Sequence, residues 1–323
     1  MWLQILCGLV ALRCLRYLFS GDDELFIEKS VSDVIFHVAN RIEKLCGGKV
    51  YVGLRIPDAD SGTKQTIDMV LVTKGVAIVI AVRNFLGSVE MDTTGSWVCK
   101  DRKKLRAVRH PDPVVETKRQ VAILESYLEQ RGLNLPEGYL IPRVVLPSPA
   151  CRPIDDITEL PEVITSDKWM ELRPEPRSGF SNWIKETFRG GKSEIHDGIF
   201  QQLDFILRTA PMWDRLELKG DRTILGEFSD FKGAREDIQA LRDVRRSKVS
   251  QLTIQKSSIF GVLGRSEVHV LYSPRDYRTE GASTLDWKDA TVRSNTEVLF
   301  QPIDSKKPQK IKLSSFVSMT LST

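Results

Sequence analysis

The sequence predicts an α/β fold, with helices flanking a mixed sheet, followed by a separate β-rich C-terminal domain. Residues 66–73 and 76–84 are two short runs rich in Val and Ile on either side of a turn at 74–75, as expected of strands buried on both faces. Apolar residues at helical spacing across 27–45 predict a helix before them. Short alternating runs recur after Pro211, which is typical of small barrels or sandwiches.

The order of the expected elements along the chain defines the predicted fold. Helix, strands, helix, strand is the order of a sheet covered by helices, and 86–91 and 96–100 are expected to extend that sheet. Pro113 opens the second helix, because proline is tolerated in a first helical turn. By residue number, we expect helices at 27–45, 113–130, 196–209 and 234–246, and strands at 50–56, 66–73, 76–84, 86–91, 96–100, 140–146, 163–165, 216–219, 248–254, 267–272, 297–301 and 310–321.

The 323 residues are enough for two domains of ordinary size. We expect an N-terminal apolar segment at 1–24, an α/β domain at 25–210 with a Pro-rich insert at 147–192, and a β-rich domain at 211–323. A hydrophobic content of 41% with 28% charged residues is typical of a folded protein. The five cysteines and four histidines are scattered and lack metal-type spacing, which argues against a disulfide framework and against a zinc enzyme.

Residues 1–20 contain no acidic residue, and a nearly continuous apolar run at 1–12 precedes Arg13 and Arg16. Counted through Phe19, the segment approaches the length needed to cross a hydrocarbon layer of about 30 Å. Cations placed after the apolar run would leave the body of the protein facing the cytoplasm. Three interpretations remain open: a membrane anchor, an organelle transit peptide, and a helix packed on the body. The expected location is therefore a membrane with the body facing the cytoplasm, or an organelle.

A basic run lies between the predicted sheet and the second helix. If the run lies beside the face of the sheet that carries a functional site, it would follow the phosphate backbone of a nucleic acid, and each cation that contacts a phosphate would release counterions. The alternative is a solvated loop, because a net charge of +4 does not require a nucleic-acid partner. The candidate nucleic-acid-binding residues are Arg102, Lys103, Lys104, Arg106 and Arg109.

Two charged residues interrupt the apolar strands, Asp68 in the first and Arg83 at the end of the second. A charge inside a buried strand costs roughly several kcal/mol unless it is paired or binds a ligand. The two residues are therefore expected either to form a structural ion pair or to belong to a functional site.

The same strands belong to a longer pattern: Thr66-Ile67-Asp68, Gly75, Ala81-Val82-Arg83-Asn84, Gly87 and Trp97. Through these residues the sequence, over roughly 26–145, resembles the core of the NERD (nuclease-related) domain, a branch of the PD-(D/E)XK endonuclease superfamily. The resemblance implies a restriction-endonuclease-like mixed sheet flanked by helices. It also implies Mg²⁺-dependent phosphodiester cleavage by clustered carboxylates and a lysine.

Several family positions hold different residues in this chain. Ala81 stands where the family carries its metal-binding Glu and offers no ligand, and Thr66 replaces the acid before Ile-Asp. Arg83 stands in place of Lys, and arginine is a poor substitute for a proton-handling lysine because it stays charged. In the family's helix motif, Glu116 takes the place of Gln, and Gln120 lies one turn later on the same face.

We favour a catalytically impaired module that binds nucleic acid or another phosphate backbone, with Asp68 paired to Arg83. The alternative is an active Mg²⁺-dependent phosphodiesterase in which Glu116 replaces the missing acid, Asp68 is the metal ligand, and Arg83 and Gln120 complete the site. No cofactor is expected unless this alternative holds. A third hypothesis is a membrane-tethered interaction protein, with residues 1–20 as the anchor and the β-rich domain as the surface for protein partners of unknown identity.

Overall fold

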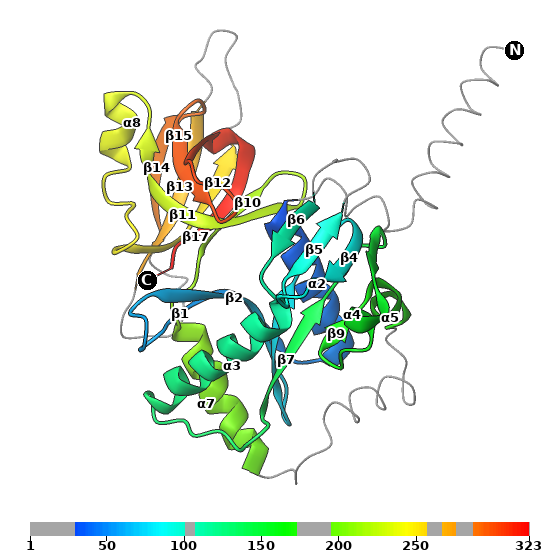
Figure 1. Ribbon diagram of the computed structural model, residues 1–323. Helices are drawn as coiled ribbons and strands as arrows, with labels where there is room; N and C mark the ends of the chain where they lie inside the picture. Colours follow the sequence, from blue (N-terminus) through cyan, green and yellow to red (C-terminus); the bar gives the residue numbers. More distant parts are fainter. Residues whose placement is uncertain (1–29, 101–106, 173–194, 257–266, 276–286, 323) are drawn as a thin grey trace, which may run out of the picture.

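The computed structural model describes residues 30–100, 107–172, 195–256, 267–275 and 287–322 (Figure 1). Strands of these residues form three sheets of five, four and eight strands. The predicted fold class is confirmed, because the two smaller sheets are mixed and carry helices, while the eight-stranded C-terminal sheet is antiparallel throughout.

The five-stranded sheet is the centre of the first domain and runs in the order β1-β2-β3-β7-β9. The first three strands are antiparallel neighbours, and the last two join in parallel. The prediction of two adjacent buried strands across 66–84 is confirmed, and every residue of β3 is buried. The strands are β1 (Lys49–Pro57), β2 (Lys64–Val72), β3 (Ala77–Val82), β7 (Leu140–Val145) and β9 (Val163–Ile164).

Helices cover both faces of this sheet. Helix α2 (Val31–Cys46) packs on the face that carries Met69 and Ile80, whereas α3 (Pro113–Glu129) and α7 (Ile195–Thr209) pack on the face that carries Val70 and Val79. Because strand side chains alternate between faces, Asp68 and the residue after β3, Arg83, belong to the α3 face. The sequence thus places the two charges on one side of the sheet.

Local signals set the helix boundaries. The Ser30 hydroxyl accepts the Asp33 N–H at 3.2 Å and caps α2, which ends at Gly47 with φ of +64°, a left-handed conformation that glycine adopts without strain. The Asp112 carboxylate accepts the Val114 N–H at 2.8 Å at the start of α3. The structure therefore confirms Pro113 as the first residue of this helix.

The segments 86–91 and 96–100 were expected to extend the main sheet, and this prediction was wrong. They form a separate sheet in the order β6-β5-β4-β8. After β3 the chain turns at Gly87, which has φ of +78°, and its N–H donates to the Ala150 carbonyl instead of to the main sheet. The strands are β4 (Gly87–Met91), β5 (Trp97–Lys100), β6 (Ala107–His110) and β8 (Cys151–Pro153).

The described part of the predicted insert, 147–172, is built into the domain. It contributes β8 to the small sheet and β9 to the main sheet, and adds the short helices α4 (Asp155–Thr158) and α5 (Ser166–Glu171). Trp169 of α5 is 1% exposed and packs against the α2 side of the core. Residues 173–192 of the insert lie outside the described residues.

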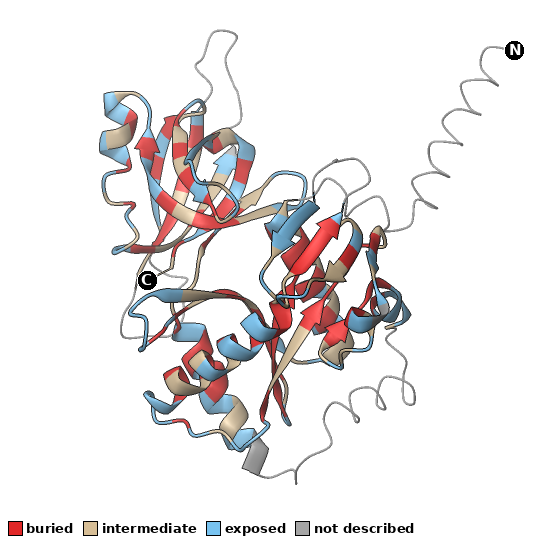
Figure 2. Cartoon of the chain, viewed as in Figure 1, coloured by how far each residue is buried: buried red, intermediate tan, exposed pale blue. Residues whose placement is uncertain are grey.

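The C-terminal sheet is curled and has its own core (Figures 1 and 2). Its order is β14-β13-β12-β17-β10-β11-β15-β16, and buried residues follow its strands in Figure 2. The strands are β10 (Asp214–Leu218), β11 (Arg222–Lys232), β12 (Val249–Lys256), β13 (Glu267–Pro274), β14 (Lys288–Arg293), β15 (Glu297–Pro302), β16 (Gln309–Lys312) and β17 (Phe316–Thr320).

Two expected elements of this domain differ in the structure. The helix predicted at 234–246 is only α8 (Arg235–Ala240). After it, Leu241 and Val244 are buried in the core, and the backbone N–H groups of residues 242, 244 and 245 donate to carbonyls two or three residues back, as in turns. The strand predicted at 310–321 is divided by the 3₁₀ turn η2 (Leu313–Ser315), where buried Leu313 donates to the Thr296 carbonyl. Strand β14 was not predicted.

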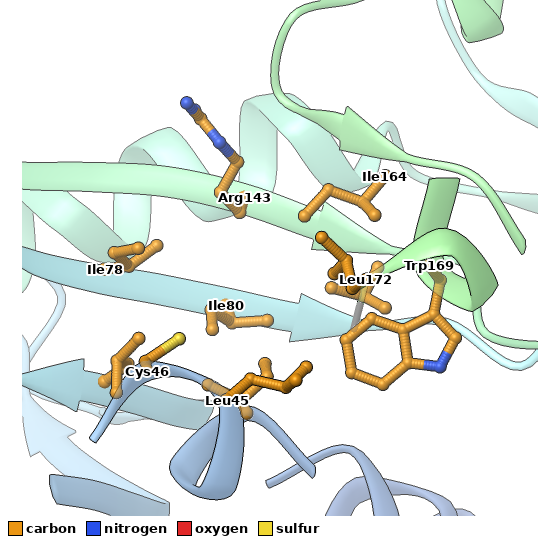
Figure 3. Close-up of a pocket in the computed structure, with 11 residues that line it drawn as sticks. Leu45, Cys46, Ile78, Ile80, Arg143, Ile164, Trp169 and Leu172 are labelled. Carbon is orange, nitrogen blue, oxygen red and sulfur yellow. The ribbon is translucent and has the colours of Figure 1, made fainter. Parts of the chain in front are cut away.

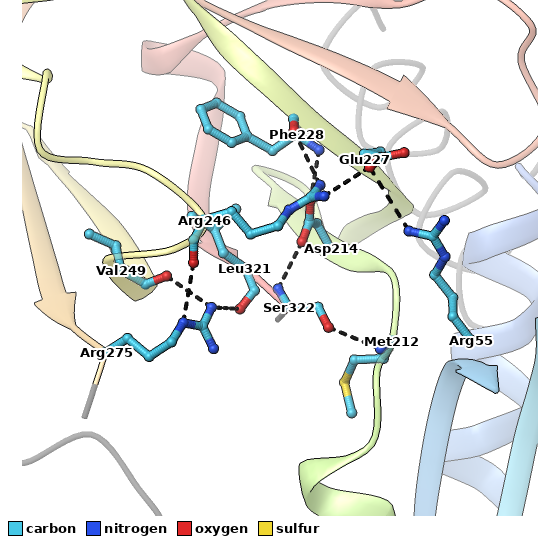
Figure 4. Close-up of polar contacts among 10 residues, drawn as sticks. All are labelled: Arg55, Met212, Asp214, Glu227, Phe228, Arg246, Val249, Arg275, Leu321 and Ser322. Carbon is cyan, nitrogen blue, oxygen red and sulfur yellow. Dashed lines mark hydrogen bonds and ion pairs between the residues drawn. The ribbon is translucent and has the colours of Figure 1, made fainter. Parts of the chain in front are cut away.

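The two domains share an interface along the outer strand of the main sheet. Arg55 of β1 donates its N–H to the Pro211 carbonyl at 2.8 Å, and Trp213 donates its N–H to the Gly53 carbonyl at 2.8 Å. Glu227 lies between Arg55, at 4.0 Å, and Arg246, at 2.8 Å (Figure 4). The outer edge of β1 is therefore hydrogen-bonded in part to residues 211–213 of the same chain.

The same polar network fixes the last described residue. Arg246 also contacts Asp214, whose side chain is 1% exposed. The other oxygen of Asp214 accepts the Ser322 N–H at 2.8 Å, and the Ser322 hydroxyl accepts the Met212 N–H at 2.9 Å. The end of the described chain is therefore held at the junction of the two domains.

Residues 1–20, expected to form an anchor, a transit peptide or a packed helix, lie outside the described residues. Among the residues that are described, none of the helices combines the length and the apolar character needed to cross a membrane.

Candidate active site

Asp68 and Arg83 meet on the α3 face of the main sheet. Arg83 Nη1 lies 2.7 Å from Asp68 Oδ2, and the Val82 N–H donates to the same oxygen at 2.8 Å. The side chains are 14% and 22% exposed, so the pair is largely desolvated. The structure therefore forms the ion pair that the sequence left as one of two interpretations.

Glu116 joins this pair from the first turns of α3. Arg83 Nη2 lies 3.0 Å from Glu116 Oε2, so one guanidinium bridges a strand carboxylate and a helix carboxylate. A planar guanidinium suits this role because its donors have a fixed fork geometry. Asp68, Arg83 and Glu116 form what we call the bridged trio.

Ala81 is buried and faces an apolar cluster. It is 1% exposed and packs in the same cluster as Trp97, Val114 and Val144. Because Ala81 and Arg83 are two residues apart, both belong to the α3 face of the sheet. The position at which the resemblance expects a metal-binding acid is thus occupied by hydrocarbon.

Gln120 lies one turn after Glu116 and contacts the strand backbone. Its Nε2 donates to the Thr66 carbonyl at 2.9 Å, and within the described part of the chain its buried Oε1 accepts no hydrogen bond. The Thr66 hydroxyl accepts the indole N–H of Trp213 at 3.2 Å, and Arg55 stacks over that indole at 3.9 Å. Gln120 and Thr66, both at family positions, therefore hold α3 and the C-terminal domain against β2.

The charges of the bridged trio act on the pKa values of Asp68 and Arg83. Burial of Asp68 raises the pKa of its carboxyl above the ordinary range, Glu116 adds to this, and the charge of Arg83 and the Val82 N–H oppose it. Burial lowers the pKa of Arg83, but the charges of Asp68 and Glu116 outweigh it, so the pKa of Arg83 is raised. The guanidinium remains charged at every accessible pH.

His110 is a residue near the site that sequence reasoning did not select. Its ring stacks on Phe85 with centroids 4.8 Å apart. Burial lowers the pKa of His110, and the positive charge of Arg83 lowers it further. No metal-type spacing surrounds this histidine in the sequence, and its proximity to Arg83 arises from the pairing of β6 with β5.

Asp33, an acid in the first turn of α2, contacts the C-terminal domain. Its Oδ1 accepts the Thr223 N–H at 2.8 Å, its Oδ2 accepts the Ser30 hydroxyl at 2.9 Å, and Arg222 Nε lies 3.7 Å away. Ser32 accepts the Leu225 N–H at 3.0 Å next to it. This acid therefore holds β11, and it makes no hydrogen bond or ion pair to the bridged trio.

Most of the candidate nucleic-acid-binding run lies outside the described residues. This applies to Arg102, Lys103, Lys104 and Arg106, whereas Arg109 in β6 is described, with a 69% exposed side chain, and lies 3.2 Å from Asp92. Lys100 and Ala107 are partners across β5 and β6. The two ends of the basic run are therefore fixed next to each other at one end of the small sheet.

The bridged trio does not fit a magnesium ion. Mg²⁺ binds through carboxylate oxygens and water in octahedral geometry, but here a permanent cation lies between the two carboxylates and Ala81 supplies no third oxygen. Across the described ranges no group of three or more His, Cys, Asp or Glu side chains is arranged to hold a metal ion. The side chains of the bridged trio therefore do not form a magnesium site.

A small apolar cavity lies on the other face of the main sheet (Figure 3). It is enclosed by α2, β3, β7, β9 and α5, with Cys46 and Trp169 among its lining residues. Arg143 borders it, with its guanidinium pointing away from the apolar side chains (Figure 3). The cavity is separated from the bridged trio by the sheet.

Residues 33–147 match a protein-family model described as the nuclease-related domain, NERD. This range begins at Asp33 and includes the bridged trio, Ala81 and Gln120. A comparison with curated proteins gave no match.

Proposed function

We propose that the chain, which carries a nuclease-related domain at residues 33–147, binds nucleic acid through its phosphate backbone and does not cleave it. The observation that supports this proposal is the position of Arg83. Its guanidinium occupies the space between Asp68 and Glu116, the two carboxylates on which a metal would depend.

The chemistry of Arg83 supports the absence of cleavage. Arginine is not deprotonated in proteins, so it cannot release its charge to make room for a second cation. Displacing it would move a charged group out of a site where it has two partners at 2.7 and 3.0 Å. The bridged trio is therefore a structural unit that stabilises the junction of β2, β3 and α3.

Binding to phosphate is assigned to the basic run and not to Arg83, since Arg83 is already neutralised by two acids. The run holds five cations between 102 and 109, and its ends are fixed at the Lys100–Ala107 pair. His110, at the end of β6, lies next to Phe85 on the side of Arg83. Nucleic acid held by the run would therefore lie beside the face of the sheet that carries the bridged trio.

The test is a salt titration of binding. We would measure anisotropy of labelled single-stranded and double-stranded DNA and RNA with the full chain, and with a variant in which the five cations of the run are changed to Gln. Every phosphate that the variant no longer neutralises should reduce the slope of log K against log salt by about 0.7 to 0.9. A matched control changes five exposed lysines elsewhere: Lys44, Lys74, Lys168, Lys232 and Lys288.

The proposal expects a lower slope and weaker binding for the run variant and little change for the control. Equal weakening in both variants would show that only net charge matters, and absence of binding at low salt would refute the proposal.

A second candidate function, Mg²⁺-dependent cleavage with Glu116 in place of the missing acid, is favoured by one observation. Glu116 and Asp68 do approach a common point, the Arg83 guanidinium. Nicking of plasmid by the wild-type chain that requires Mg²⁺ and disappears in Glu116→Ala would support this candidate and overturn the non-cleaving proposal.

A further inference from the structure

Strand β11 of the C-terminal sheet extends past the strand beside it and leaves part of its edge unpaired. β10 begins at Asp214, which pairs with Gly226, whereas the pairing of β11 with β15 continues to Lys232. After Gly226, β11 therefore has a neighbouring strand on one side only within the described residues. The four residues that follow Phe228 give this edge a length of roughly 14 Å.

Side chains, and not a strand, complete the hydrogen bonding of Phe228 on the unpaired side. Its N–H donates to Asp214 Oδ2 at 2.7 Å, and its carbonyl accepts Arg246 Nη2 at 3.2 Å (Figure 4). The register with β15 shifts between Phe228 and Asp230, so Ser229 is the extra residue of a β-bulge. The exposed Ser229 side chain makes no hydrogen bond in the described part of the chain.

A groove of about 730 Å³ runs along this edge. Residues 228–230 of β11 form one side of it, and residues 244–247, which follow α8, form the other. Phe228 and Val244 are 8% and 2% exposed and give the groove an apolar floor. Its volume is within the range of roughly 300–1,000 Å³ that ligand sites have. Because the second side faces the strand edge, the groove suits a single extended segment better than the edge of another folded sheet.

The two sides of the groove carry different charges. The exposed Arg245 makes no ion pair within the described ranges, and its Nε donates to the Arg242 carbonyl at 3.1 Å. On the opposite side, Asp230 Oδ1 accepts the Phe231 N–H at 2.8 Å. A carboxylate in the groove would be attracted by Arg245 and repelled by Asp230, so it would lie against residues 244–247.

We propose that this groove binds an extended acidic peptide segment of a partner protein, which adds to the unpaired edge of β11 and places a carboxylate against Arg245. In strand addition, main-chain hydrogen bonds along an exposed edge supply affinity, and pockets for alternate side chains supply specificity. Here the apolar floor receives one side chain, and Arg245 selects an acid. The proposal does not rest on the function proposed for the nuclease-related domain, because no residue of the groove lies within 33–147.

The test pans a random heptapeptide phage library against the full chain. Enriched peptides are synthesised with a fluorescent label, and their anisotropy gives the affinity for the wild type, for Arg245→Glu and for the control Arg235→Glu. Arg235 is exposed at the start of α8, does not line the groove, and gives the same change in net charge. Amide hydrogen exchange of residues 229–232, with and without peptide, measures whether a strand is added.

The proposal expects enrichment of peptides that contain acidic residues and slower exchange of residues 229–232 when such a peptide is bound. Arg245→Glu should weaken binding by about tenfold or more, the value of one hydrogen bond between charged groups. Arg235→Glu should bind these peptides as the wild type does.

Several results would overturn the proposal. Enrichment of no peptide, or only of peptides without acids, would remove the proposed partner. Equal weakening in both variants would reduce the effect to net charge, and unchanged exchange of residues 229–232 would exclude strand addition. Sedimentation that shows a dimer abolished by Arg245→Glu would assign the groove to a second copy of the chain. Loss of labelled-oligonucleotide binding in Arg245→Glu but not in Arg235→Glu would assign it to nucleic acid.

Discussion

Replacing Arg83 with Met should destabilise the first domain by more than any exposed ion pair would. The change removes the cation from Asp68, whose side chain is 14% exposed, and leaves it with the Val82 N–H at 2.8 Å. Breaking a buried ion pair from one side costs about 3–5 kcal/mol. Because Asp68 keeps a backbone donor and Arg83 is 22% exposed, we expect the low end, about 3 kcal/mol at pH 7.

The loss of stability should depend on pH in a direction that the geometry fixes. Burial already raises the pKa of Asp68, and removing Arg83 removes the opposing charge. A carboxyl whose folded pKa exceeds its unfolded value stabilises the protein fully below the unfolded pKa and loses this contribution as the pH rises through the folded pKa. The deficit of Arg83→Met should therefore be smallest near pH 4 and grow towards pH 7.

Urea unfolding followed by tryptophan fluorescence at several pH values measures this difference. Arg109→Met is the control, since its partner Asp92 lies 3.2 Å away but Arg109 is 69% exposed, and exposed pairs contribute about 0–1 kcal/mol. Adding Asp68→Asn to Arg83→Met should recover part of the loss and remove its pH dependence. Equal unfolding midpoints for Arg83→Met and Arg109→Met would refute the buried-bridge argument.

Three further predictions concern the surroundings of the bridged trio. Trp213→Phe removes the indole donor to Thr66 but keeps a ring beneath Arg55, and should lower the free energy of unfolding by about 1 kcal/mol in thermal melts; an unchanged melt would argue against this contact. The pKa of His110 is lowered, so its contribution to stability is present above pH 6.5 and is lost as the pH falls through the folded pKa. His110→Phe should therefore flatten the dependence of unfolding free energy on pH between pH 7 and 5. A pH dependence parallel to that of the wild type would contradict this prediction. The double change Ala81→Glu with Arg83→Lys should cost about 3 kcal/mol by overpacking and burying an acid and give no Mg²⁺-dependent nicking, whereas a gain of nicking would show that the packing adapts to a metal site.

The elements that the sequence predicted well were those with a complete local signal. The strands across 66–84 are uniformly apolar, and α3 begins with a capping Asp112 followed by Pro113. The Asp68–Arg83 pair could be anticipated because a buried charge needs a partner and each strand offers one. Glu116 was placed near them by the resemblance, because it stands at the Gln position of the family's helix motif.

Contacts between distant parts of the chain left no such signal. Asp33 accepts the N–H of Thr223, 190 positions away, and Trp213 reaches Thr66 across 147 positions. The residues next to Asp33 and Trp213 in the sequence contain no pattern that predicts these distant partners. The separate small sheet was missed for a similar reason, since the turn at Gly87 depends on a bond to Ala150 beyond the next helix.

The proposed lack of a metal site and the stability of this fold are linked through Arg83. A nuclease-type arrangement leaves carboxylates facing one another until a cation arrives, whereas here Arg83 supplies that cation permanently and Asp33 is bound to β11. Removing Arg83 alone would not restore a metal site, because Ala81 still offers hydrocarbon at the third position. Adding an acid at Ala81 alone would place a third carboxylate near a cation already shared by two. Neither single change therefore supplies a metal site, because the first leaves Ala81 in place and the second leaves Arg83 between the carboxylates.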